Sequence, residues 1–180
     1  MPSHVTDDGC RIGFSITGPD QAPPLVLSNS LGTDRSLWHA QIGPLAERFR
    51  VLSYDTRGHG QSEATPAPYS IDRLGRDVLS LMDASGIGRA HVCGVSIGGL
   101  TALWLGVHAP ERVNRLVLAN TAARIGSLES WEDRIGVARA GGLDALADGT
   151  MSRWFTAAFR LAEPDTVARM RATSTALGCA

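Results

Sequence analysis

The chain has 180 residues, of which 43% are hydrophobic, and its formal net charge is −1. This length and apolar content fit a globular chain with a buried core, at about 100–200 residues per domain. The near-neutral charge and the lack of a basic run exclude the usual features of a protein that binds nucleic acid. Residues 1–13 include acidic side chains and no apolar run, so no secretory signal is expected.

The cysteines and the longest uncharged run bear on where the protein works. Cys10, Cys93 and Cys179 are odd in number and far apart, with no CxxC spacing. Reduced thiols and a cytoplasmic location are therefore expected. Residues 90–110 carry no Asp, Glu, Lys or Arg, but they contain several glycines and a serine. A buried strand followed by a helix explains this run better than a membrane span, so no membrane association is expected.

From residue 23 onward, short apolar runs alternate with helical spacing of apolar residues. The pattern predicts a strand at 23–30, then a strand and a glycine-rich turn over 49–62. The segment 70–88 is predicted to hold a helix with Gly86 just beyond its end, and a strand follows at 89–95. The segment 97–113 is predicted to hold a helix that ends before Pro110, and a strand follows at 114–123. Strands that alternate with helices indicate an α/β fold with a mostly parallel sheet and flanking helices.

The pattern changes after Ala123. Residues 127–159 are amphipathic with helical spacing and show no strand signal, which is typical of an all-helical insertion or lid. The expected organisation is a core over residues 1–124 and a helical lid segment over residues 125–180.

The segment Gly94-Val95-Ser96-Ile97-Gly98 matches the pattern G-x-S-x-G. The pattern alone is weak, but here it follows a predicted strand and opens a predicted helix, which is the context that a nucleophilic serine needs. Small flanking residues let a strained turn close, and the helix N-terminus directs N–H groups at a developing oxyanion. Ser96 is therefore the candidate nucleophile. The alternative is a core serine in a glycine-rich turn.

An oxyanion hole needs a second donor, usually from a loop after an earlier strand. Residues 27–34, LSNSLGTD, follow the first apolar strand. The backbone N–H groups of Leu31 and Ile97 are the candidate pair of donors. The alternative for residues 27–34 is an ordinary turn between a strand and a helix.

Five segments together resemble the 3-oxoadipate enol-lactonases, an α/β-hydrolase family. They are LSNSLGTDRSLW, YDTRGHGQS, CGVSIGGL, LANTAARIG and RWFT, and the resemblance covers about residues 10 to 172. The GHG turn and G-x-S-x-G are common to many α/β-hydrolases. SNSLGT and NTAARIG are much more specific to this family.

The resemblance implies hydrolysis of a five-membered enol-lactone to 3-oxoadipate, in the β-ketoadipate pathway of aromatic catabolism. It implies no metal and no organic cofactor. The expected partner is a small-molecule lactone that carries a carboxylate, which an arginine would bind. The candidate substrate-binding residues are Ser30, Trp38, Arg124, Trp131, Arg134 and Trp154. Each arginine has a solvated surface position as its alternative, and each tryptophan has packing as its alternative.

In this fold the triad runs in the order serine, acid, histidine. No histidine follows His108, and the family's acid and histidine are expected beyond the last sheet strand predicted here. The triad acid and histidine are therefore expected to be absent from this chain, which looks truncated at its C-terminus. Of the histidines present, His59 in RGHGQS is the best candidate base, although the resemblance makes it a structural turn residue. Asp55 is interpreted as a turn residue.

The strand at 114–120 would be a bare apolar edge of the sheet. Such edges pair with other chains, so self-association is expected.

The alternatives to a lactonase are another serine hydrolase, such as a carboxylesterase or a C–C bond hydrolase, and an inactive hydrolase fold that acts as a binding module. Ser96 excludes a dehalogenase or an epoxide hydrolase, since both need a carboxylate at this turn.

Overall fold

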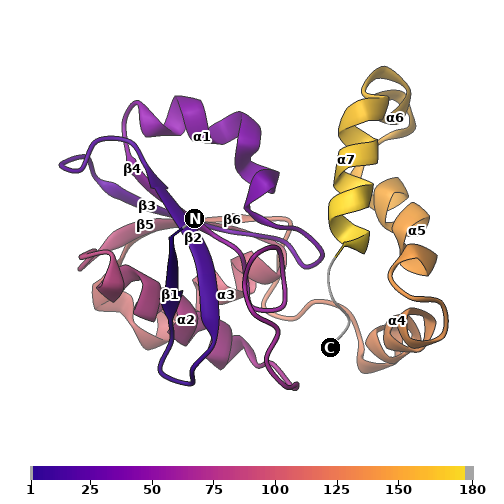
Figure 1. Cartoon of the computed structure of the whole chain (residues 1–180), viewed down its shortest axis with the longest axis horizontal. Helices are drawn as coiled ribbons and strands as arrows, with labels where there is room; N and C mark the ends of the chain where they lie inside the picture. The colour runs from indigo at the N-terminus through magenta and orange to yellow at the C-terminus, as the bar shows by residue number, and fades with distance from the viewer. Residues whose placement is uncertain (1, 177–180) are drawn as a thin grey trace. The chain divides into compact units, whose positions relative to one another are not determined.

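The computed structural model describes residues 2–176, which divide into two compact units between Ile125 and Gly126. The first unit holds a sheet with helices on both faces, and the described part of the second unit is helical (Figure 1). The strands are β1 (Ser3–Val5), β2 (Arg11–Thr17), β3 (Pro24–Ser28), β4 (Arg50–Tyr54), β5 (Ala90–Val95) and β6 (Val113–Ala119). The helices of the first unit are η1 (Arg35–Trp38), α1 (His39–Ala46), α2 (Ile71–Ala84), α3 (Ile97–His108) and η2 (Pro110–Arg112), where η marks a 3-10 helix.

The strands form one sheet in the order β1-β2-β4-β3-β5-β6. Strands β4, β3, β5 and β6 run parallel to one another, whereas β2 pairs in the antiparallel sense with both β1 and β4. The α/β class and the mostly parallel sheet are thus confirmed. Strands β1 and β2 precede residue 23, where the first predicted strand begins, so that prediction is incomplete. In β2 the apolar residues Ile12, Phe14 and Ile16 alternate with Gly13 and Ser15, which is the pattern of a strand.

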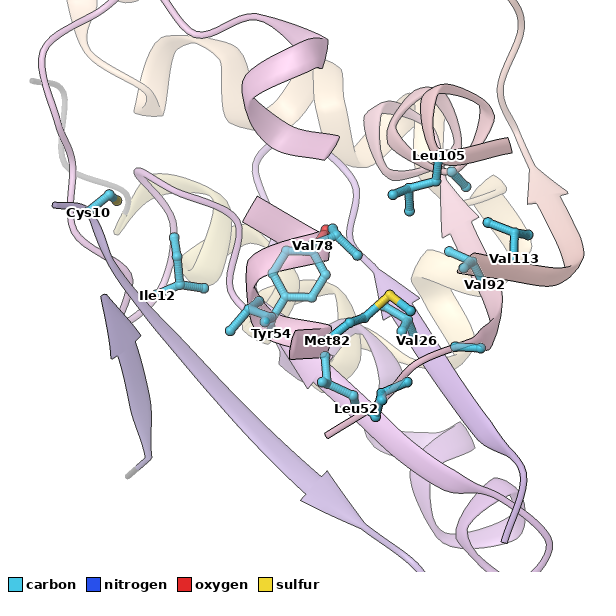
Figure 2. Close-up of a cluster of buried hydrophobic side chains, with 14 residues drawn as sticks. Cys10, Ile12, Val26, Leu52, Tyr54, Val78, Met82, Val92, Leu105 and Val113 are labelled. Atoms are coloured by element: carbon cyan, nitrogen blue, oxygen red, sulfur yellow. The ribbon is translucent and has the colours of Figure 1, made fainter. Parts of the chain in front are cut away.

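Both faces of the sheet are covered, so the central strands are apolar on both sides. In β3, Val26 belongs to the cluster under α2 and α3, while Leu25 and Leu27 pack on the opposite face toward η1 and α1. Figure 2 shows the larger cluster, in which Val26 and Leu52 of the sheet meet residues of α2 such as Met82. This packing fixes the ends of β3 and β5, from which the candidate site is built.

The predicted elements from residue 23 onward are confirmed in type and order, with shorter bounds. Helix α2 begins after Ser70, whose side chain accepts the N–H of Arg73, and it ends before Gly86, which has φ 65°. Helix α3 ends at His108, before Pro110, as expected. Helix α1 was not predicted. Its sequence, HAQIGPLA, contains a glycine and a proline, which weaken the helical pattern.

The second unit contains four helices within the described residues. They are α4 (Leu128–Gly141), α5 (Asp144–Trp154), α6 (Ala157–Ala162) and α7 (Pro164–Thr175), so the helical character predicted for 127–159 is confirmed. Helix α4 begins with a reciprocal cap between Ser127 and Ser130. In residues 2–176, no helix combines the length and the apolar character that a bilayer crossing needs.

Candidate active site

Ser96 lies at the turn where β5 ends and α3 begins. Its backbone has φ 56° and ψ −116°, a conformation that is uncommon for a residue with a side chain and that costs of order 1–3 kcal/mol. The surroundings hold it there, because the Ser96 N–H donates to the Ala119 carbonyl at 3.0 Å and the Thr121 hydroxyl donates to the Ser96 carbonyl at 2.8 Å. The predicted strand–turn–helix context of the serine is present, and its backbone is strained as expected.

The glycines of the G-x-S-x-G pattern have steric reasons. A Cβ on Gly94 would lie 2.1 Å from the carbonyl oxygen of Gly98, so the strand end and the helix start approach too closely for any side chain. A Cβ on Gly98 would lie 2.3 Å from the carbonyl oxygen of Ser28 at the end of β3. The helix start is therefore packed directly against the chain that enters the loop of residues 29–34. We call residues 29–34 the oxyanion loop.

Two backbone N–H groups are available near this junction. Ile97 is the first residue of α3, and the first N–H groups of a helix have no intrahelical acceptor. No side chain caps this helix end. Within residues 2–176, no hydrogen bond uses the Leu31 N–H as its donor. The positive end of the α3 dipole adds to the attraction of an anion at this place.

The oxyanion loop is held in shape by short-range contacts. Thr33 donates to the Ser30 carbonyl through both its N–H at 3.2 Å and its hydroxyl at 2.8 Å. Gly32 has φ 80°, which favours glycine. Asn29 is fully buried, its amide donates to the Tyr54 carbonyl at 2.7 Å, and its side-chain oxygen accepts the indole N–H of Trp38 at 2.7 Å. The loop is thereby fixed to β4.

The candidate substrate-binding residues have different surroundings. In the first unit, Ser30 is buried and its hydroxyl donates to the Leu31 carbonyl at 3.4 Å. Trp38 is buried in the cluster on the α1 face of the sheet and bonded to Asn29, so packing accounts for it. Arg124 is exposed after β6. The substrate-binding roles of these residues stay predictions.

In the second unit, the guanidinium of Arg134 lies 4.9 Å from the ring centroid of Trp131. Burial, and then the nearby charge of Arg153, lower the pKa of Arg134. Trp154 is half-buried at the end of α5. Arg134 and Trp131 thus form a cation–π pair on α4, and their roles toward a substrate also stay predictions.

His59 joins the oxyanion loop to the turn after β4, and Asp55 joins the start of η1 to the same turn. His59 Nε2 accepts the Gly32 N–H at 3.1 Å, and its Nδ1 lies 3.1 Å from the Arg57 carbonyl. The Asp55 carboxylate accepts the N–H groups of Arg35 at 2.8 Å and Gln61 at 3.0 Å, which agrees with its interpretation as a turn residue. The contact between this turn and the oxyanion loop has no signal in the sequence motifs.

Within residues 2–176, the histidines make their contacts with residues other than Ser96. His4 Nε2 lies 2.8 Å from the Ser80 hydroxyl. The ring of His91 meets the edge of Phe49, and that of His108 stacks on Trp104. His39 is exposed at the start of α1. Since both ring nitrogens of His59 are engaged elsewhere, the described residues place no histidine in contact with the candidate nucleophile.

Comparison with known proteins gives the fold a family context. Residues 23–175 match the family model described as alpha/beta hydrolase fold. The chain is 42% identical over 166 residues to 3-oxoadipate enol-lactonase 2 of Acinetobacter baylyi, covering 92% of this chain and 62% of the relative. It is 44% identical over 151 residues to 3-oxoadipate enol-lactonase 1 of the same organism, covering 84% of this chain and 56% of the relative. The chain thus spans about three-fifths of the length of these curated relatives.

Solved structures agree with this match. The crystal structure of the enol-lactonase from Burkholderia xenovorans LB400 superimposes with a TM-score of 0.95 at 47% identity, over 98% of this chain and 68% of that one. A thermophilic esterase from Thermogutta terrifontis superimposes with a TM-score of 0.90 at 26% identity, over 98% of this chain and 66% of that one.

Proposed function

Because the chain belongs to the alpha/beta hydrolase family, we propose that the protein hydrolyses a lactone ester through an acyl-enzyme on Ser96. The observation that carries the proposal is the backbone of Ser96, held at φ 56° between β5 and α3. A structural serine would gain nothing from this strain, whereas a nucleophile gains exposure at the head of a helix. The relatives named enol-lactonases favour 3-oxoadipate enol-lactone as the substrate.

The geometry suggests the following steps. The Ser96 hydroxyl oxygen attacks the lactone carbonyl carbon, and the carbonyl oxygen becomes an oxyanion that accepts N–H bonds from Leu31 and Ile97. The bond from the carbonyl carbon to the ring oxygen then breaks, which leaves an ester on Ser96 and an enolate. An enolate is a better leaving group than an alkoxide, so little help from a general acid is needed. Water then hydrolyses the ester to the acid and returns a proton to Ser96, while the enolate takes up the proton that Ser96 lost during the attack and becomes the ketone.

The attack also needs a base, and in this fold the histidine follows the nucleophile in chain order. His59 is poorly suited to the task, because its unprotonated nitrogen already accepts the Gly32 N–H. We therefore also propose that the general base for Ser96 is a residue other than His59.

For the substrate carboxylate, Arg134 has more local support than Arg124. Arg134 is half-buried, its pKa is lowered by burial, and no carboxylate in residues 2–176 forms an ion pair with it. A half-buried cation that has no acidic partner among residues 2–176 is stabilised when a ligand brings a carboxylate. Its stacking on Trp131 would orient the guanidinium for a two-point contact.

The test is a single-turnover measurement of the 180-residue chain with the enol-lactone, beside Ser96→Ala. A burst of product that requires Ser96 supports the hydrolase. Binding of the lactone without any such burst would instead favour a binding module, and equal bursts from both chains would refute the role of Ser96.

The carboxylate contact is tested with Arg134→Gln and, as a matched control, Arg139→Gln, an exposed arginine of the same helix. Loss of the charged contact should weaken binding of the enol-lactone about 10- to 100-fold. Binding of a lactone without a carboxylate should stay unchanged in both variants. Equal effects of Arg134→Gln on the two lactones would contradict this assignment.

A further inference from the structure

The oxyanion loop and the start of η1, which follows it, are joined to the turn after β4 by backbone N–H groups that donate to side chains of the turn. Gly32 N–H donates to His59 Nε2 at 3.1 Å, and Arg35 N–H donates to the Asp55 carboxylate at 2.8 Å. Arg35 and Asp55 also form an ion pair at 3.3 Å. The His59 contact involves the Gly32 N–H, which belongs to the peptide directly after Leu31. The N–H of Leu31 itself is the candidate oxyanion donor.

The partners of the His59 ring define its protonation. A backbone N–H can only donate, so His59 Nε2 must be unprotonated where it meets Gly32. A carbonyl can only accept, so Nδ1 must carry the proton where it meets the Arg57 carbonyl. The two contacts together require the neutral ring with its proton on Nδ1. Protonation of Nε2 would set two donors against each other.

We propose that neutral His59 is a positioning residue, which holds the Leu31–Gly32 peptide in the orientation that the oxyanion loop needs and releases this peptide when it is protonated. The inference rests on the proposed function for the meaning of the loop, but the hydrogen bond itself does not depend on Ser96. Gly32 is suited to such control, because at φ 80° its peptide gains no support from a regular secondary structure.

Arg57, whose carbonyl accepts the hydrogen bond from His59 Nδ1, is anchored by its side chain. The Arg57 side chain is buried and donates to Asp77 at 2.7 Å through Nε and at 2.7 Å through one terminal nitrogen. The other terminal nitrogen donates to the Thr65 hydroxyl at 3.0 Å. A rigid carbonyl selects the Nδ1–H tautomer, which leaves Nε2 free to accept the Gly32 N–H.

Burial and the neighbouring carboxylates act in opposite directions on the pKa of His59. Burial lowers the pKa and is the largest effect, while the carboxylates of Asp55 and Asp34 favour the cation. The Asp55 carboxylate is paired with Arg35, and the Arg57 guanidinium is paired with Asp77. The neutral ring is therefore the form present at neutral pH, and release of the peptide is expected only as the pH falls below the ordinary histidine range of about 6.5.

The test is NMR spectroscopy of the full ¹⁵N-labelled chain. A two-bond ¹H–¹⁵N spectrum at neutral pH should show His59 with a protonated Nδ1 and a bare Nε2. On acidification, the Gly32 amide shift should move together with the His59 ring signals, with the same midpoint. A protonated Nε2 at neutral pH, or a Gly32 amide that ignores the His59 titration, would overturn the proposal.

Three variants separate positioning from general stability. His59→Gln places an amide oxygen where Nε2 stood, so it should keep the Gly32 amide shift and abolish its pH dependence. His59→Leu has no acceptor, and hydrogen exchange at Gly32 should become about tenfold faster or more. The control His39→Leu, at an exposed histidine of α1, should change neither. If His59→Gln behaves like His59→Leu while both chains remain folded by their amide spectra, the acceptor role is refuted. Inactivity at Ser96 would refute only the hydrolase proposal.

Discussion

Arg57 and Asp77 form a doubly hydrogen-bonded ion pair, with two N···O distances of 2.7 Å and side chains that are each only 2% exposed. Arg57 follows β4 and Asp77 lies on α2, so the pair ties the turn that carries His59 to a helix under the sheet. Asp8, in the turn between β1 and β2, adds a second carboxylate at 3.0 Å. Such a buried network is costly to assemble and costly to break.

Removing one partner of this pair should destabilise the chain strongly. Asp77→Asn leaves the Arg57 guanidinium buried with only Asp8 as its counter-charge, and we expect the free energy of unfolding to fall by about 3 kcal/mol. Urea denaturation followed by circular dichroism measures the change.

The matched control for Asp77→Asn is Asp72→Asn on the same helix. The Arg76–Asp72 pair has a comparable distance of 2.8 Å, but its side chains are 56% and 51% exposed. Exposed pairs of this kind contribute little, so no measurable change is expected. If both variants lose the same stability, burial is not what makes the Arg57–Asp77 pair matter.

Asp8 should make stability depend on pH in the acid range. Its hydrogen bond from Arg57, and then that from the Thr6 hydroxyl, hold the Asp8 pKa well below its ordinary value of about 3.9. The unfolded chain therefore binds a proton at Asp8 at a higher pH than the folded chain does. The stabilisation is complete above the unfolded pKa and is lost as the pH falls below it toward the folded pKa.

The measurement for Asp8 is urea denaturation of the wild type and Asp8→Asn between pH 7 and pH 2. The wild type should be more stable at neutral pH, and the difference should shrink as the pH falls below about 4. Asp20→Asn, at a carboxylate that is 86% exposed, is the control and should show little difference at any pH. A constant gap between wild type and Asp8→Asn would contradict the linkage.

Gly98 should tolerate no side chain. An alanine there would place Cβ 2.3 Å from the Ser28 carbonyl oxygen, and we expect a loss of about 3 kcal/mol or more as the backbone shifts. Gly43→Ala on α1 is the control, because nothing lies within 4 Å of its Cβ position. That change should raise stability by up to about 1 kcal/mol. A Gly98→Ala chain with the wild-type melting temperature would mean that α3 and β3 are less closely packed than described.

Much of the fold could be predicted because periodicity reports burial. The apolar run in β3 and the helical spacing of α2 are direct consequences of faces that pack on the core. Helix α1 could not be found in the same way, since Gly43 and Pro44 lie inside it and it buries no residue fully. Strand β2 was a different kind of omission, because its alternation was present in the sequence.

The candidate site shows where local sequence stops being informative. The position of Ser96 between strand and helix could be predicted, because G-x-S-x-G carries its own steric logic. The contact from His59 to Gly32 could not be predicted, because 27 residues separate the two and no motif links a ring nitrogen to a particular N–H. The pairing of β3 with β4 creates this contact, and pairing is a property of the whole sheet.

The free edge of the sheet is the remaining feature with a measurable consequence. Strand β6 pairs with β5 on one side, and no other strand in residues 2–176 lies on its other side. Val117 and Leu118 of this strand are 57% and 41% exposed. An apolar edge with unpaired backbone groups is a template for strand addition, so we propose that copies of this 180-residue chain associate through β6.

A lysine on the edge should suppress this association. We expect the wild-type chain to sediment as dimers or larger species at micromolar concentrations, and Val117→Lys to shift the population toward the monomer, because a charge at an edge strand opposes pairing. Val107→Lys makes the same chemical change at an exposed valine of α3, away from the edge, and should leave the association unchanged. Sedimentation velocity over a range of concentrations distinguishes the cases. A wild-type chain that stays monomeric throughout, or an equal response to the two lysines, would show that β6 is not the contact.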